Sequence, residues 1–466
     1  MPKPTLPTPS SQRLRGRPPA LATLAALAAL AAFTVGGTAA HAEDLLQIYR
    51  EARNNDPVFA SARAALDAGR EALPQGRALI LPTLNASANT VYNDDWFSNR
   101  GGPTAGQVFY RDFNSNGWAV TLSQPLFRPQ NWTQYKEAEF QVAQAEATYA
   151  QATQDLIVRT AQAYFDVLAS QDSLAFIQAQ KAAISEQLAQ AKRNFEVGTA
   201  TITDTHEAQA RYDLSGSQEI AAQADLEIKK RALQQLIGKL PGGLTPLKPK
   251  VALSTPQPEA MESWADAAQK QSYAVRVQEA AVEIADREVQ RNRQAHLPTV
   301  DIVAAYNRIG QNNAVSTGIG FDQKAATIGL QLAVPIYSGG LTSSRVRQAQ
   351  ALLEKSRSDL ENSRRSVALA ARQSYVGVTN GIAQVRALEQ ALLSSQTALD
   401  SNKLGYEVGV RINIDVLNSQ QQVFQTQRDL SAARYNTIMN GLKLKSAAGS
   451  LGEADVEEVN RLLGSQ

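Results

Sequence analysis

Few residues of this chain have the types and spacing that catalysis requires. The sequence contains no Cys, and its three His residues, His41, His206 and His296, are far apart along the chain. Thiol catalysis and Cys-containing metal sites are therefore excluded, and a site built on any one of these His residues is not expected. Neither a Ser/His/Asp set nor a Gly-rich phosphate loop occurs. We therefore expect no enzymatic activity, no catalytic residue, no metal and no cofactor.

The charged residues that do recur follow two similar turns. "FEVGTATITD" ends at Asp204 and "YEVGVRINID" ends at Asp415, 211 residues later. Each stretch contains a Gly, Gly198 or Gly409, that can take the positive φ needed where two helices reverse direction. The chemistry open to such carboxylates is electrostatic, because they attract cations and repel anions. On these residues alone, ordinary solvated carboxylates remain the simpler alternative.

The elements that position these turns are also duplicated. Residues 64–83 resemble residues 280–299 at an offset of 216, and "SQPLF" at 123–127 resembles "AVPIY" at an offset of 210. Offsets this constant indicate two copies of one structural unit, each with the order helix, strand, strand, long helix, turn, helix. We predict a first repeat over residues 43–238, a linker over 239–262, a second repeat over 263–449 and a tail over 450–466.

Each repeat is predicted to contain a very long helix. Residues 131–197 include no Gly or Pro, and a helix of that extent would be about 100 Å long. In the second repeat, only Gly377 and Gly381 interrupt residues 343–408. Small and apolar residues recur at heptad spacing in the first of these helices, with one four-residue insertion, which is typical of closely packed helices. A dimeric coiled-coil rod would share this pattern.

Four further segments are predicted as strands because apolar residues alternate with polar or small ones. An apolar face opposite a small polar face suits a lipid-facing, water-lined barrel, although a soluble sandwich has the same alternation. Four strands cannot close a barrel, and open sheet edges are not tolerated in lipid, so three chains would have to supply twelve strands. The alternating apolar residues are Leu84, Ala86 and Ala88; Trp118, Val120 and Leu122; Val300, Ile302, Ala304 and Tyr306; and every second residue from Ala326 to Ile336. Surface loops are expected over residues 93–117 and 307–324.

The first 42 residues are predicted to be a cleaved signal peptide. Four basic residues precede an apolar stretch that is short for a transmembrane anchor and ends at "AHA", residues 40–42. Cleavage there would change the formal net charge from +2 to −2, and nothing indicates nucleic-acid binding. After Ala42, no apolar run is long enough to span a bilayer as a helix. The basic residues are Lys3, Arg13, Arg15 and Arg17.

Several stretches of the mature chain form a recognisable set, from "DLLQIYREARNNDP" at 44–57 through "TAQAYFDVL" at 160–168 and "VPIYSGG" at 334–340 to "LKLKSAAGSLGEADV" at 442–456. Together they resemble the TolC family of outer-membrane export ducts. The resemblance implies a membrane fold that is all-α plus β-barrel, with four strands per chain in a trimeric twelve-stranded barrel and a long periplasmic α-helical barrel below it. The linker and the tail would form a belt around that tube.

The resemblance also implies a function and partners. A homotrimer in contact with outer-membrane lipid would conduct small molecules or secreted proteins through an iris-like periplasmic gate. It would work with a periplasmic adaptor and an inner-membrane transporter of the RND, ABC or MFS type. A soluble periplasmic coiled-coil protein, structural or adaptor-like, is the alternative.

The same resemblance assigns the pore constriction. Three copies of Asp415 would form an acidic ring on the pore axis. The family commonly has a second acidic residue one helical turn later, where this chain has Asn418. We therefore expect a weaker cation preference and looser blockade by multivalent cations.

The gate contacts are also assigned by resemblance, and Gly198 and Gly409 would lie in the periplasmic tip turns. Thr203 and Asp204 belong to the first hairpin, and Tyr406 and Arg411 to the second. An Asp204–Arg411 pair and a hydrogen bond of Tyr406 would hold the tips shut, at about 1 kcal/mol each.

Overall fold

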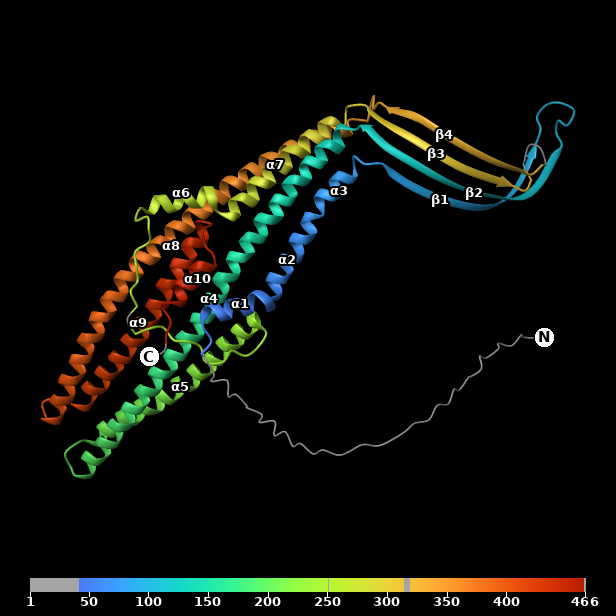
Figure 1. Cartoon of the computed structure of the whole chain (residues 1–466). Helices are drawn as coiled ribbons and strands as arrows, with labels where there is room; N and C mark the ends of the chain where they lie inside the picture. Colours follow the sequence, from blue (N-terminus) through green and yellow to red (C-terminus); the bar gives the residue numbers. More distant parts are fainter. Residues whose placement is uncertain (1–41, 250, 314–318, 465–466) are drawn as a thin grey trace, which may run out of the picture. The chain divides into compact units, whose positions relative to one another are not determined.

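The computed structural model describes residues 42–249, 251–313 and 319–464. All of the predicted signal peptide except Ala42 lies outside these residues. The element order repeats along the chain, and each half contains two strands followed by a long helix and a shorter one, as the sequence predicts (Figure 1). The helices are α1 (Leu45–Asn55), α2 (Pro57–Arg70), α3 (Ala72–Ala78), α4 (Pro129–Glu196), α5 (Ile202–Ile237), α6 (Met261–Gln271), α7 (Tyr273–Gln294), α8 (Leu341–Glu407), α9 (Asn413–Ala447) and α10 (Glu453–Asn460). The strands are β1 (Thr83–Ser98), β2 (Val108–Phe127), β3 (Thr299–Gln311) and β4 (Phe321–Ala333).

The two long helices, α4 with 68 residues and α8 with 67, confirm the sequence prediction. At 1.5 Å per residue each is about 100 Å long. Pro129 begins α4 at a position where its missing N–H breaks no hydrogen bond. None of the helices in the described part of the chain is both long enough and apolar enough to cross a bilayer.

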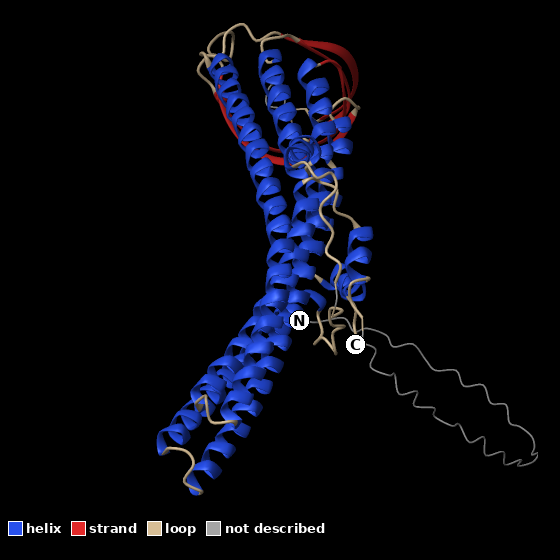
Figure 2. Cartoon of the chain, turned by 90° about the vertical axis from the view of Figure 1, so that its left-hand side faces the viewer, coloured by secondary structure: helices blue, strands red, loops and turns tan. Residues whose placement is uncertain are grey.

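The helices pack side by side. α4 lies along α5 and α9, α9 lies along α8, and α7 packs between α4 and α8 (Figures 1 and 2). α8 and α9 approach closely at Gly377 and Gly381, where a Cβ would collide with side chains of α9. At Gly377 the added Cβ would lie 2.7 Å from Nδ2 of Asn440. Glycine at these positions therefore permits the close contact between the two helices.

The strands form one antiparallel sheet in the order β1-β2-β3-β4. Residues paired across neighbouring strands share a face, and the register places the predicted apolar residues of all four strands on one side. One such row consists of Leu84, Leu122, Ala304 and Ile328. The row on the opposite face next to it consists of Asn85, Thr121, Ala305 and Thr327. The alternation therefore predicted the two faces correctly.

Several strand boundaries differ from the sequence prediction. β4 ends at Ala333 rather than Ile336, because Pro335 has no N–H for the strand ladder. Both regions expected to be loops partly extend the strands. In the first, β1 continues to Ser98 and β2 begins at Val108. In the second, β3 continues to Gln311 and β4 begins at Phe321. The polar residues of these extensions obscure the alternation on which strand prediction depends.

The largest apolar core surrounds the middle of the long helices. It contains side chains of α1, α4, α5, α9 and α10. The segment before α6 joins it through Leu244, and the hydroxyl of Tyr164 on α4 donates to the carbonyl of Thr245 at 2.8 Å. Leu247 pairs with Leu463 in an isolated antiparallel bridge. The interrepeat segment and the C-terminal helix thus cover the middle of the helix layer.

Candidate functional site

The two helix pairs end in turns with the same backbone geometry. Gly198, between α4 and α5, and Gly409, between α8 and α9, both have φ of +79°. In the first turn the carbonyl of Asn194 accepts from two backbone N–H groups, at 2.8 and 3.2 Å, and in the second the carbonyl of Gly405 does so at 2.9 and 3.0 Å. No atom lies within 4 Å of a Cβ placed on either glycine, so positive φ rather than space requires glycine here.

The helices that leave the turns are capped differently. Thr201 and Asp204 form a capping box at the start of α5. The Asp204 carboxylate accepts from the Thr201 N–H at 3.0 Å and from its hydroxyl at 2.8 Å. The corresponding cap of α9 is Ile412, which provides no side-chain hydrogen bond. Asp415, the counterpart of Asp204, is therefore not engaged in capping, and its Oδ2 lies 3.7 Å from Nη1 of Arg411.

The predicted gate residues gather at the tips, but the Asp204–Arg411 pair is not formed within the described chain. Asp204 caps α5, Arg411 lies beside Asp415, and Thr203 is exposed to solvent. The pair therefore remains a prediction for contacts between chains. Tyr406 accepts a hydrogen bond from Nδ2 of Asn194 at 3.1 Å, which joins the two hairpins.

Arg211 is a further tip residue, and sequence reasoning did not identify it. Its guanidinium reaches from α5 to α9, where Nη1 donates to Oε1 of Gln421 at 2.7 Å and Nη2 donates to Oδ1 of Asn418 at 3.1 Å. Both acceptors are neutral amides. No sequence signal specifies this contact, because it depends on how two helices from different repeats face one another.

The apolar contact between the two hairpins near the tips is small. Ile184, Leu188, Ala208 and Leu417 form a separate core cluster there. Nearby, Asn413 is 1% exposed, and neither polar atom of its amide has a hydrogen-bond partner among the described residues. A buried amide without partners costs about 1–3 kcal/mol. The packing of the tips is therefore easier to separate than the large core at the middle of the helices.

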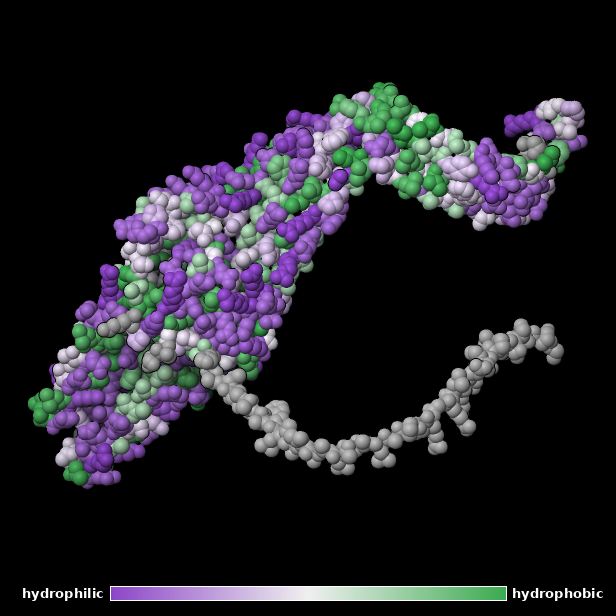
Figure 3. Space-filling model, in the orientation of Figure 1, coloured by the Kyte–Doolittle hydropathy of each residue, from purple (hydrophilic) through white to green (hydrophobic). Residues whose placement is uncertain are grey.

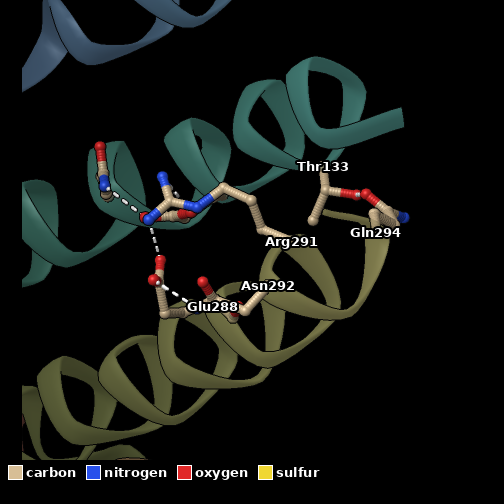
Figure 4. Close-up of polar contacts among 7 residues, drawn as sticks. Thr133, Glu288, Arg291, Asn292 and Gln294 are labelled. Atoms are coloured by element: carbon tan, nitrogen blue, oxygen red, sulfur yellow. Dashed lines mark hydrogen bonds and ion pairs between the residues drawn. The ribbon is translucent and has the colours of Figure 1, made fainter. Parts of the chain in front are cut away.

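Polar residues connect the two repeats at the other end of the helices, next to the sheet. Arg128 forms a two-pronged ion pair with the buried carboxylate of Asp301, at 2.7 and 2.5 Å. Arg291 of α7 reaches toward α4, beside Glu288 (Figure 4). Its Nη1 lies 3.6 Å from Oε2 of Glu137. Burial raises the pKa of the Glu137 carboxyl above its usual range, although Arg291 opposes the shift.

Comparison with known proteins identifies relatives of the whole chain. The model of the family described as outer membrane efflux protein matches residues 48–239 and again residues 264–450. The outer membrane protein TolC of Vibrio cholerae is 35% identical over 91% of this chain and 94% of its own length. The alkaline protease secretion protein AprF of Pseudomonas aeruginosa is 32% identical over 90% of this chain and 87% of its own.

A solved structure has the same fold. The Campylobacter jejuni CmeC outer membrane channel superimposes with a TM-score of 0.75, over 91% of this chain and 90% of that one. The two sequences are 16% identical, so this likeness concerns the fold alone.

Proposed function

Because the chain belongs to the outer membrane efflux protein family, we propose that three copies of it form a passive, gated exit duct. The protein is an outer-membrane channel, and its family is one of channels rather than of enzymes. Relatives are named for efflux and for the secretion of proteases. We assign both kinds of transport, of small molecules and of secreted proteins, to this duct.

The sheet carries this proposal. Its apolar face is exposed, with Ile328 81% and Leu330 72% accessible. Apolar side chains gather over the part of the sheet nearest the helices, whereas polar ones cover its far end (Figure 3). The rings of Trp118 and Tyr306 lie beside this band with their centroids 5.4 Å apart, and aromatic residues are enriched at membrane interfaces. The apolar face therefore suits contact with lipid.

The edges of the sheet determine the number of chains. Within the described chain, β1 pairs only with β2, and β4 pairs only with β3. Such edges cannot stay open in lipid, so β1 of one copy must pair with β4 of the next. Three copies give twelve strands, an even number in the range of outer-membrane barrels.

The edge helices support the same head-to-tail assembly. α5 and α8 lie on opposite sides of the α4–α9 pair, and both carry exposed large apolar residues. A contact between α5 of one chain and α8 of the next joins unlike surfaces and closes into a ring. The exposed apolar residues include Leu214, Ile220 and Ile228 on α5, and Leu352, Leu369, Val376 and Leu393 on α8.

The tips form the gate and the docking end. Their contacts within the chain are few, so an adaptor that binds the tips can separate the hairpins at low cost. Val197, Val408 and Val410 expose apolar surface there, which is suited to a periplasmic adaptor. Energy comes from an inner-membrane transporter, because the duct itself only conducts.

Neighbouring residues on opposite faces of β4 provide the test. Ile328→Arg places a charge on the lipid-facing side, at a cost of about 2–4 kcal/mol per chain, whereas Thr327→Arg places it on the polar side. We expect Thr327→Arg to yield conducting pores in planar bilayers and Ile328→Arg to fail to assemble in the outer membrane. Equal assembly of the two variants would contradict the proposed orientation of the sheet.

A further inference from the structure

We propose that Arg211 adds a positive ring to the constriction, next to the acidic ring of Asp415, and so cancels the cation preference of the duct. This inference rests on the proposed function, because the ring requires three copies around one pore. Arg211, a residue of the first repeat, thereby helps to determine ion selectivity at a constriction whose other residues, Asp415 and Asn418, belong to α9.

Arg211 keeps its charge at this site. Its two hydrogen bonds go to the amide oxygens of Asn418 and Gln421, at 3.1 and 2.7 Å. Among the described residues, no carboxylate lies within ion-pair distance of it. An amide accepts a hydrogen bond but carries no charge, and an arginine is not deprotonated in a protein. The guanidinium is therefore held in place without being neutralised.

The guanidinium lies on the same face of α9 as Asp415. Asn418 follows Asp415 by three residues, which makes their side chains neighbours on the helix surface, and Gln421 follows Asn418 at the same step. Asn418 and Gln421 are exposed, and Asp415 is partly exposed. Asn418 is about 4.5 Å further along the helix axis than Asp415. Any pore that the Asp415 carboxylates face therefore also meets the Arg211 guanidinium groups.

The local charges then no longer favour cations. Arg411 lies 3.7 Å from Asp415 and offsets its charge, so Arg211 leaves one net positive charge per chain among these three residues. The charge of Asp204 lies elsewhere, in the capping box of α5. Three guanidinium groups that are hydrogen-bonded to neutral amides repel a multivalent cation at the level where a second acidic ring would hold it. The duct should consequently discriminate little between cations and anions.

Two substitutions separate the charge of Arg211 from its role as a link between hairpins. Arg211→Gln removes the charge, whereas Arg211→Lys keeps the charge and loses the forked hydrogen bonds. The readouts are the reversal potential across planar bilayers in asymmetric KCl and blockade by the trivalent cation hexaamminecobalt. A purely structural role would change channel opening in both variants and selectivity in neither.

We expect the wild type and Arg211→Lys to show near-zero reversal potentials and weak blockade. Arg211→Gln should shift the reversal potential toward that of potassium and bind the trivalent cation roughly tenfold more tightly, since three positive charges leave the pore. Unchanged selectivity and blockade in Arg211→Gln would overturn the inference. A strongly cation-selective wild type would do the same. Absence of any conducting trimer in the wild type would instead refute the proposed function.

Discussion

The different caps of the two tip helices allow the role of Asp415 to be tested by a single substitution. Asp204 forms a capping box with Thr201, whereas Ile412 has no side-chain oxygen, so the equivalent carboxylate of Asp415 takes no part in a cap. Ile412→Thr would recreate the Thr-x-x-Asp box at the start of α9. Since Ile412 is 61% exposed, the change removes little apolar packing.

The expected effects follow from the geometry of the first tip. A Thr at an N-cap stabilises a helix by about 1 kcal/mol relative to an aliphatic residue. The Asp415 carboxylate would turn toward the backbone N–H of residue 412, as Asp204 turns toward that of Thr201 at 3.0 Å. If this turn increases the distance between each carboxylate and a permeating ion from ~5 Å to ~8 Å, their attraction weakens by about 0.3 kcal/mol in water. Three copies then lower cation occupancy roughly fivefold before salt screening.

Two measurements check this prediction. Hydrogen exchange in the first turn of α9 should slow by about fivefold, the factor that corresponds to 1 kcal/mol. The reversal potential should move toward anion preference. Thr201→Ile is the matched control, because it weakens the start of α5 without touching Asp415. If Ile412→Thr slows exchange but leaves the reversal potential unchanged, Asp415 does not face the permeating ions, and the reasoning is refuted.

Other predictions concern packing, protonation and the gate. Gly381→Ala should destabilise the protein by about 1–2 kcal/mol, because overpacking against α9 outweighs the gain in helix propensity. Gly441→Ala, with no atom within 4 Å of the new Cβ, should stabilise the protein by up to about 1 kcal/mol. Thermal unfolding measures both variants, and a Gly381→Ala variant more stable than Gly441→Ala would contradict this account. Glu137→Gln should raise stability relative to the wild type at about pH 8, because the raised pKa of the buried carboxyl makes its ionised form costly. This advantage should vanish as the pH falls to about 4, where the wild-type carboxyl is protonated too, and a constant difference across that range would refute it. Asp204→Ala combined with Arg411→Ala should increase single-channel conductance if the two residues pair between chains, and no increase would argue against that latch.

The fold was predictable because its signals are periodic and local. Alternation along β3 and β4 specifies which residues share a face, and the absence of Gly and Pro from residues 131–197 specifies a continuous helix. The end of β4 was misplaced because alternation continues past Ala333, where Pro335 prevents further pairing.

The site was less predictable because its contacts join distant segments. The spacing from Gly409 to Asp415 repeats that of the first tip, yet the two carboxylates have different surroundings, because the cap residue is Thr in one copy and Ile in the other. The contact between Arg211 and Asn418 depends on the packing of α5 against α9. A pattern along one segment cannot specify such a contact.

The number of chains around one barrel tests the central claim most directly. Native mass spectrometry of the protein, extracted from the outer membrane in mild detergent, measures it without assumptions about shape. We predict a single species with three times the mass of one mature chain, because four strands with two open edges require partners. A folded species with the mass of one chain, stable without detergent, would contradict this account.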